Sequence, residues 1–197
     1  MKRICVFCGS SGGGDPAYLH AAVALGSALA ERELALVYGG ASVGMMGALA
    51  AAVLRAGGDV TGVIPRDLAD KEVALTSLAD LRVVDSMHAR KALMAELADG
   101  FVAMPGGFGT FEEFFEVLTW AQLGLHHKPC GLLNIGGYYD RLVAFLDHTV
   151  EQHFVLPAHR SMLIIEEDPD ALLDRFATYQ APQVDKAAWI LGLPRVS

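Results

Sequence analysis

Residues 104–113 read Met104-Pro105-Gly106-Gly107-Phe108-Gly109-Thr110-Phe111-Glu112-Glu113. The run follows an apolar, strand-like segment at residues 100–104 and opens a strongly helical segment at residues 111–123. Its three glycines let the backbone turn sharply and bring N–H groups close to a ligand. Those groups lie at a helix N-terminus, where unpaired donors and the helix dipole favour an anion, typically phosphate. The run therefore predicts a strand, a phosphate-binding turn and a helix.

The rest of the chain alternates strand and helix signals with short turns. This pattern is typical of an open parallel sheet with helices on both faces, an α/β fold. Strands are expected at residues 3–7, 34–38, 59–64, 81–84, 101–104, 130–134 and 162–165. Helices are expected at residues 16–32, 45–56, 87–98, 111–123, 138–153 and 169–178. No linker or repeat divides the chain, so we expect one domain over residues 1–180 and an irregular tail over residues 181–197.

Composition limits the classes of function. The 197 residues suit one domain with a substantial core, and 53% hydrophobic content excludes a disordered chain. A net charge of −8 argues against a broad nucleic-acid surface but allows a local site for one nucleotide. No signal peptide is visible, and the apolar stretches are too short to cross a membrane. With three cysteines, an odd number, we expect a cytoplasmic protein without a membrane partner.

Three glycine-rich turns follow predicted strands, and ligands of open parallel sheets bind at the carboxyl ends of the strands. We therefore expect one pocket built from the turn at residues 105–109 and from two further loops. The candidate residues of these loops are Gly9, Ser10, Gly39, Gly40, Gly44 and Met46. For these two loops a purely structural need for glycine is an equal alternative. Neither matches the dinucleotide pattern with its downstream acid, so a nicotinamide cofactor is disfavoured.

Glu113 has two interpretations. Thr110 as helix N-cap with Glu113 three residues later would form a capping box that satisfies two backbone donors. Alternatively, a carboxylate directly after a phosphate cradle is a candidate for chemistry on the molecule that carries the phosphate. Glu112 is the other candidate, or simply an acid favoured in a first helical turn. The spacing leaves these alternatives open.

Arg90 is the second candidate for a functional side chain. Asp85 or Ser86 can cap a helix whose apolar stripe includes Leu93, Met94 and Leu97. Arg90 lies on the face of this stripe, where a guanidinium needs an anionic partner unless its head extends to the surface. Lys91 points about a quarter-turn away, toward the flank of the pocket or a partner chain.

The helix expected at residues 111–123 has a wide apolar surface. It includes Phe111, Phe114, Phe115, Val117, Leu118 and Trp120. Either the helix is fully buried in the monomer, or it also packs against a second subunit that could complete the pocket. The seven histidines show no metal-ligand spacing, so no metal site is expected.

The chain resembles the LOG (Lonely Guy) family of cytokinin riboside 5′-monophosphate phosphoribohydrolases, once labelled possible lysine decarboxylases. The signature P-G-G-x-G-T-x-x-E is present at residues 105–113, and M-H-x-R-K is present as Met87-His88-Ala89-Arg90-Lys91. Supporting matches are Val6-Phe7-Cys8-Gly9-Ser10-Ser11, Tyr38-Gly39-Gly40 through Met46-Gly47, and Thr119-Trp120-Ala121-Gln122-Leu123-Gly124. The resemblance covers at least residues 4–153.

The resemblance implies a Rossmann-like fold, a homodimer, and no metal or other cofactor. It implies Arg90 and Glu113 as the catalytic pair. The implied substrate-binding residues are Glu72, Arg90, Lys91, Gly106, Gly107, Phe108, Gly109, Thr110, Phe111, Glu112 and Thr119. The implied reaction hydrolyses the N-glycosidic bond of a nucleoside 5′-monophosphate to free base and ribose 5-phosphate. Whether the base has an isoprenoid group on N6 or is plain adenine stays open.

Two other functions compete with this hypothesis. A non-catalytic carrier of a phosphorylated cofactor, such as the molybdenum cofactor, would need the phosphate cradle but not the pair Arg90 and Glu113. A decarboxylase would normally need pyridoxal phosphate on a lysine, and only Lys91 lies near the expected site. Both intact signatures favour the hydrolase.

Overall fold

Within residues 1–69 and 74–182, which the computed structural model describes, seven strands form one sheet in the order β4-β3-β2-β1-β5-β6-β7. Every neighbouring pair is parallel. The strands are β1 Arg3–Phe7, β2 Ala35–Tyr38, β3 Val60–Pro65, β4 Asp80–Val84, β5 Gly100–Ala103, β6 Cys130–Leu133 and β7 Leu163–Glu166. The predicted α/β class with an open parallel sheet is confirmed.

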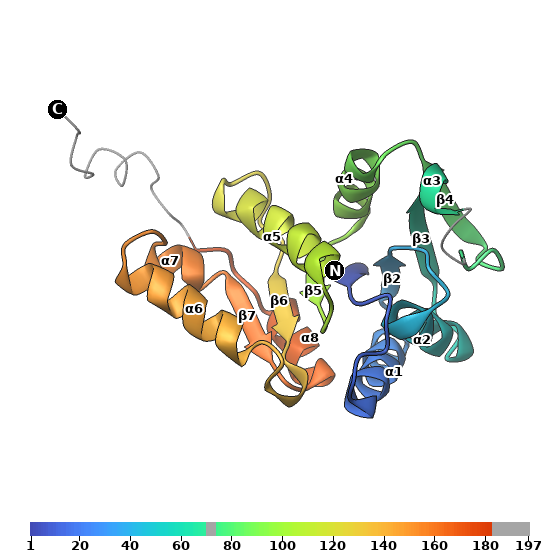
Figure 1. Ribbon diagram of the computed structural model, residues 1–197, viewed down its shortest axis with the longest axis horizontal. Coiled ribbons are helices and arrows are strands. Elements are labelled where there is room, and N and C mark those ends of the chain that lie inside the picture. Colours follow the sequence, from blue (N-terminus) through green and yellow to red (C-terminus); the bar gives the residue numbers. More distant parts are fainter. Residues whose placement is uncertain (70–73, 183–197) are drawn as a thin grey trace.

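Helices cover both faces of the sheet (Figure 1). One face packs against α1 Pro16–Glu31, α2 Gly44–Arg55 and α8 Pro169–Ala177. The other face packs against α4 Met87–Leu97, α5 Phe108–Gln122 and α6 Asp140–Glu151. The side chains of β1 alternate between the two hydrophobic cores. Ile4 and Val6 face the first layer of helices, whereas Cys5 and Phe7 face the second.

The order of the strands reverses beside β1. The chain runs outward from β1 through β2 and β3 to β4, and then returns to place β5 on the other side of β1. The loops after β1 and β5 therefore meet, and Gly9 N–H donates a hydrogen bond to Pro105 O at 3.0 Å. Such a reversal opens a crevice at the carboxyl ends of the strands, where doubly wound folds bind ligands.

The seven expected strands are all present, with small shifts at their ends, but the start of α5 differs from the prediction. The helix begins at Phe108, with Gly107 in an extended conformation at the N-cap and no side-chain cap. Thr110 is therefore inside the first helical turn, so the predicted capping box of Thr110 and Glu113 is wrong. This first turn was not predicted from the sequence because glycines at 107 and 109 flank Phe108, and glycine is a poor helix former.

Three short elements were not predicted, because four or fewer residues show no periodicity. They are α3 Arg66–Ala69, the 3-10 turn η1 Ile135–Gly137, and α7 Pro157–Arg160. The tail prediction for residues 181–197 lies almost wholly outside the described residues. Across the described part of the chain, none of the helices combines the length and apolar character that crossing a membrane requires.

Helices α1 and α2 pack very closely at Gly26. A Cβ atom at this position would lie 2.7 Å from Ala52 Cβ and 2.8 Å from Leu49 O. Both distances are shorter than van der Waals contact, so glycine is needed here for the approach of the two helices.

We predict that Gly26→Ala lowers the free energy of unfolding by up to about 2 kcal/mol, because overpacking at about 1–3 kcal/mol outweighs a helix-propensity gain of about 1 kcal/mol. Urea denaturation measures the change. Ala24→Gly, at an exposed position of the same helix, calibrates the propensity alone and should cost about 1 kcal/mol. A stabilised Gly26→Ala variant would contradict the close packing.

Candidate active site

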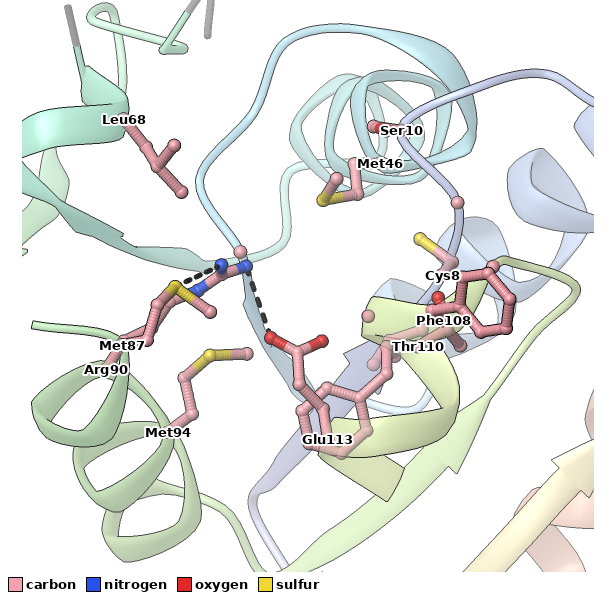
Figure 2. Close-up of a pocket in the computed structure, with 16 residues that line it drawn as sticks. Cys8, Ser10, Met46, Leu68, Met87, Arg90, Met94, Phe108, Thr110 and Glu113 are labelled. Atoms are coloured by element: carbon pink, nitrogen blue, oxygen red, sulfur yellow. Dashed lines mark hydrogen bonds and ion pairs between the residues drawn. The ribbon is translucent and has the colours of Figure 1, made fainter. Parts of the chain in front are cut away.

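A cavity of about 380 Å³ lies in the crevice beside β1 (Figure 2). It draws on the loops after β1 and β2, on the start of α5, and on side chains from α2, α3 and α4. Its lining residues are Val6, Phe7, Cys8, Gly9, Ser10, Gly39, Met46, Leu68, Met87, Arg90, Met94, Gly107, Phe108, Gly109, Thr110 and Glu113. The structure brings residues of all three glycine-rich loops to this one cavity.

The first turn of α5 supplies hydrogen-bond donors to this cavity. Because the helix begins at Phe108, the N–H groups of Phe108, Gly109 and Thr110 have no partner within the helix. Over the part of the chain that the structure describes, no other group accepts a hydrogen bond from them. Together with the helix dipole they form a site for an anion.

Arg90 is buried, with only 8% of its surface exposed, so the alternative that its head extends to the surface is wrong. Ser86 caps α4, and its Oγ accepts a hydrogen bond from Ala89 N at 3.1 Å. The Nη2 atom of Arg90 lies 3.5 Å from Glu113 Oε1, and Nη1 lies 3.6 Å from Met87 Sδ. Nε has no hydrogen-bond partner among the described residues. The guanidinium therefore retains capacity to bind a further anion or acceptor.

Gly39 makes room for this guanidinium. A Cβ atom on Gly39 would collide with Arg90 Nη2 and would lie 3.1 Å from Met46 Sδ. The backbone of Gly39 does not have positive φ, so the reason for glycine here is the approach of Arg90 rather than the conformation of the loop.

Glu113 points toward Arg90 from the first turns of α5 (Figure 2). It is 8% exposed and lines the cavity. Burial raises the pKa of its carboxyl group above the usual value for glutamate, and the positive charge of Arg90 counteracts part of that rise. A buried carboxyl group with a raised pKa beside an arginine in a cavity is typical of a catalytic acid or base.

Lys91 lies next to Arg90 but does not line the cavity. Its Nζ atom forms ion pairs with Glu112 and, at 3.1 Å, with Glu116. Burial lowers the pKa of Lys91, but the hydrogen bonds with Glu112 and Glu116 outweigh burial and raise it overall. Lys91 and Glu112 thus join α4 to α5 beside the pair Arg90–Glu113.

The predicted site residues fall into two groups. Those that line the cavity are Gly9, Ser10, Gly39, Met46, Arg90, Gly107, Phe108, Gly109, Thr110 and Glu113. Those outside its lining are Gly40, Gly44, Lys91, Gly106, Phe111, Glu112 and Thr119. The prediction for Glu72 lies outside the described residues.

Residues of the second group have other contacts. Gly44 abuts the backbone of Ser10, and its φ of +59° favours glycine. Phe111 packs against the ring of Tyr139. Thr119 is exposed, and its hydroxyl donates to Phe115 O at 2.7 Å. Whether these residues contact a substrate remains a prediction.

Sequence reasoning did not identify Leu68 and Met87, which line the cavity. Together with Met94 they make one of its walls apolar (Figure 2). Met87 begins the motif that contains Arg90, which is a signal that could have indicated it. Leu68 lies on α3, which is too short to show in the sequence. Over residues 1–69 and 74–182, no group of three or more potential ligands is placed to hold a metal ion.

Comparison with known proteins agrees with this geometry. Residues 46–176 match the model of a family described as "Possible lysine decarboxylase". Cytokinin riboside 5′-monophosphate phosphoribohydrolase LOG7 of Arabidopsis thaliana is 48% identical, over 94% of this chain and 85% of that protein. A rice protein (Oryza sativa subsp. japonica) named "Probable cytokinin riboside 5′-monophosphate phosphoribohydrolase LOGL9" is 51% identical, over 91% of this chain and 79% of that protein.

Solved structures share the fold at much lower identity. The molybdenum cofactor binding protein of Rippkaea orientalis has a TM-score of 0.67 and 22% identity, over 90% of this chain and 97% of that one. The molybdenum cofactor carrier protein of Chlamydomonas reinhardtii gives the same two values, over 90% and 99%. These structures support the Rossmann-like fold alone. The sequence relatives show more than the fold, because about half of the aligned residues are identical over nearly the whole chain. The chain therefore belongs to the LOG family, that of the cytokinin riboside 5′-monophosphate phosphoribohydrolases.

Proposed function

We propose that this protein hydrolyses the N-glycosidic bond of cytokinin riboside 5′-monophosphates, releasing the free base and ribose 5-phosphate. The observation on which this rests is the buried pair of Arg90 and Glu113, 3.5 Å apart, in the cavity that the α5 donors also enter. A non-catalytic carrier would need only the N–H donors of α5 and not the pair of Arg90 and Glu113. The names of relatives at 48% and 51% identity support the same activity.

The start of α5 supplies the site for the 5′-phosphate. The N–H groups of residues 108–110 attract an anion, and Ser10 lines the same side of the cavity. A phosphate held there is remote from the bond that breaks. Its binding energy therefore positions the ribose against Glu113 before the reaction begins.

Glu113 serves the chemical step. Cleavage of a ribose–base bond builds positive charge on the sugar, as in other glycosyl hydrolysis. A carboxylate near the anomeric carbon stabilises that charge and accepts a proton from the attacking water, whose oxygen bonds to the anomeric carbon as the bond to the base breaks; the departing base takes up one proton, so that water is divided between the sugar and the base. Burial raises the pKa of Glu113 and strengthens it as a base, while Arg90 favours the ionised form. The departing base lies against the apolar wall of Leu68, Met87 and Met94.

The contacts of Lys91 weigh against decarboxylase chemistry. A Schiff-base lysine has to lose its proton, which usually requires a lowered pKa. Two carboxylates instead raise the pKa of Lys91 and occupy its Nζ atom.

We further propose a cytoplasmic homodimer. An apolar groove between α5 and α6 is lined by Phe115, Leu118, Leu146 and Leu163 among others, and the nearby Phe145 is 60% exposed. A second copy would cover this exposed apolar surface. Sedimentation equilibrium at micromolar concentration should give twice the 21.0 kDa of one chain, and a mass of one chain would contradict the proposal.

The activity is tested with isopentenyladenosine 5′-monophosphate, AMP and the riboside without phosphate, by chromatography of the released base. We expect release only from the phosphorylated substrates. Glu113→Gln should lower kcat by about 100-fold or more, because the amide cannot act as a base. Glutamine keeps the shape of the side chain but leaves buried Arg90 without its carboxylate, so the variant should be less stable, and circular dichroism at the assay temperature is the control for folding.

Glu116→Gln is the matched control, because Glu116 lies one turn further along α5 and outside the cavity lining; kcat should stay within about threefold of wild type. The pH profile gives a second measurement. Because the pKa of Glu113 is raised and the ionised form is active, wild-type kcat/KM should fall as the pH drops through that pKa. If Glu113→Gln keeps the full wild-type rate, the role of general base passes to Glu112. If the wild type binds the nucleotide without releasing base, a non-catalytic carrier is favoured.

Gly39→Ala is predicted to impair catalysis without unfolding the protein. The added methyl group displaces the Arg90 guanidinium, so kcat/KM should fall about tenfold or more. The protein should remain folded, since the φ angle of Gly39 is not positive, but its melting temperature should fall because the displaced guanidinium loses its contact with Glu113. Gly14→Ala is the control, because a Cβ atom there meets no atom within 4 Å. Unchanged kcat/KM in Gly39→Ala would show that the position of Arg90 is not critical.

A further inference from the structure

The turn between β5 and α5 is held by three hydrogen bonds to consecutive carbonyl groups. They are Tyr139 Oη to Met104 O at 2.6 Å, Gly9 N to Pro105 O at 3.0 Å, and Tyr138 Oη to Gly106 O at 2.5 Å. One bond comes from the loop after β1, and two come from adjacent tyrosines at the start of α6. Groups outside the turn therefore hold the carbonyl oxygens of residues 104–106 in place, directly before the α5 donors.

The two tyrosines are themselves held by the end of β6. Asn134 Oδ1 accepts a hydrogen bond from Tyr139 N at 2.7 Å, and Asn134 Nδ2 donates to Asp140 Oδ1 at 2.7 Å. Gly137 has a φ of +72°, and a Cβ atom there would lie 2.5 Å from Asp140 Oδ2. The rings of Tyr138 and Tyr139 meet edge to face, with centroids 5.0 Å apart.

The tyrosines differ in burial. Tyr139 is 1% exposed and belongs to the core, so its hydroxyl is part of the stability of the fold. Tyr138 is 39% exposed and lines a smaller cavity of about 290 Å³, together with Gly106 and Tyr18, that shares Gly9, Ser10 and Gly107 with the main one. The Tyr138 hydroxyl can therefore be removed with little effect on the core.

The bond from Tyr138 determines how one peptide group faces the site. In a trans peptide the carbonyl of Gly106 and the N–H of Gly107 point in opposite directions. With Gly106 O turned to Tyr138, the Gly107 N–H points away from Tyr138, and Gly107 lines the main cavity as well as the small one. Glycine on both sides lets this peptide rotate easily, and rotation would present a carbonyl oxygen to a phosphate.

We propose that Tyr138 is a positioning residue: its hydroxyl fixes the Gly106–Gly107 peptide so that the Gly107 N–H joins the α5 donors in binding the 5′-phosphate. This inference rests on the proposed function, which places the phosphate at this turn. Tyr138 acts through the backbone and does not touch the reacting atoms.

Tyr138→Phe removes the hydroxyl and keeps the ring. We expect KM for isopentenyladenosine 5′-monophosphate to rise about 5- to 10-fold, with kcat within about twofold of wild type, because binding rather than chemistry is weakened. Calorimetry should show a matching loss of affinity for ribose 5-phosphate. The melting temperature should stay within about 2 °C of wild type. Tyr18→Phe is the matched control, since it alters a neighbouring tyrosine of the same small cavity.

The outcomes separate this inference from the proposed function. If the wild type is active, three results would each overturn the positioning role and leave the proposed function intact. They are an unchanged KM in Tyr138→Phe, an equal rise of KM in Tyr18→Phe, and a loss in Tyr138→Phe that is confined to kcat. If the wild type neither binds ribose 5-phosphate nor releases base, the proposed function fails, and the inference fails with it.

Discussion

The arrangement of α4 and α5 depends on the free-energy cost of burying two charged side chains, Arg90 and Glu113. Arg90 and Glu113 each expose only 8% of their surface, so removing either partner would leave the other buried without a compensating charge. Their meeting requires that α4 and α5 lie side by side on one face of the sheet and that Gly39 leaves space for the guanidinium. A pair 3.5 Å apart is only loosely bonded, so both groups keep capacity for a ligand. The same pair thus holds two helices together and equips the cavity for chemistry.

The topology explains why this pair meets a phosphate site. The reversal of strand order places the loops after β1 and β5 at one edge, and the start of α5 enters the crevice between them. Donors at residues 108–110 and the carboxylate of Glu113 therefore come from successive turns of a single helix. Their spacing is fixed by helical geometry rather than by a mobile loop, which suits a reaction that needs a sugar held between an anion site and a base.

Most of the fold could be predicted from the sequence, because most strands are short, largely apolar runs and several of them end at glycine-rich turns. The convergence of the glycine-rich loops followed from the same pattern, whereas the start of α5 did not. Phe108 is helical despite the poor propensity of its flanking glycines, and its side chain, 93% exposed, gives no packing signal that would have indicated this. The partners of Lys91 and the position of Leu68 could not be predicted either, since both depend on contacts between elements distant in the sequence.

The charges of α4 and α5 also bear on how the two helices find their alignment. Adjacent cations on one helix meet carboxylates on the other, Arg90 with Glu113 and Lys91 with Glu112 and Glu116. Apolar faces alone tolerate sliding by a turn, because one leucine or phenylalanine can replace another in the contact. Sliding here would strand a buried cation, at a cost of about 3–5 kcal/mol. The ion pairs therefore select a single longitudinal register of α5 along α4 and disfavour packings displaced by one turn.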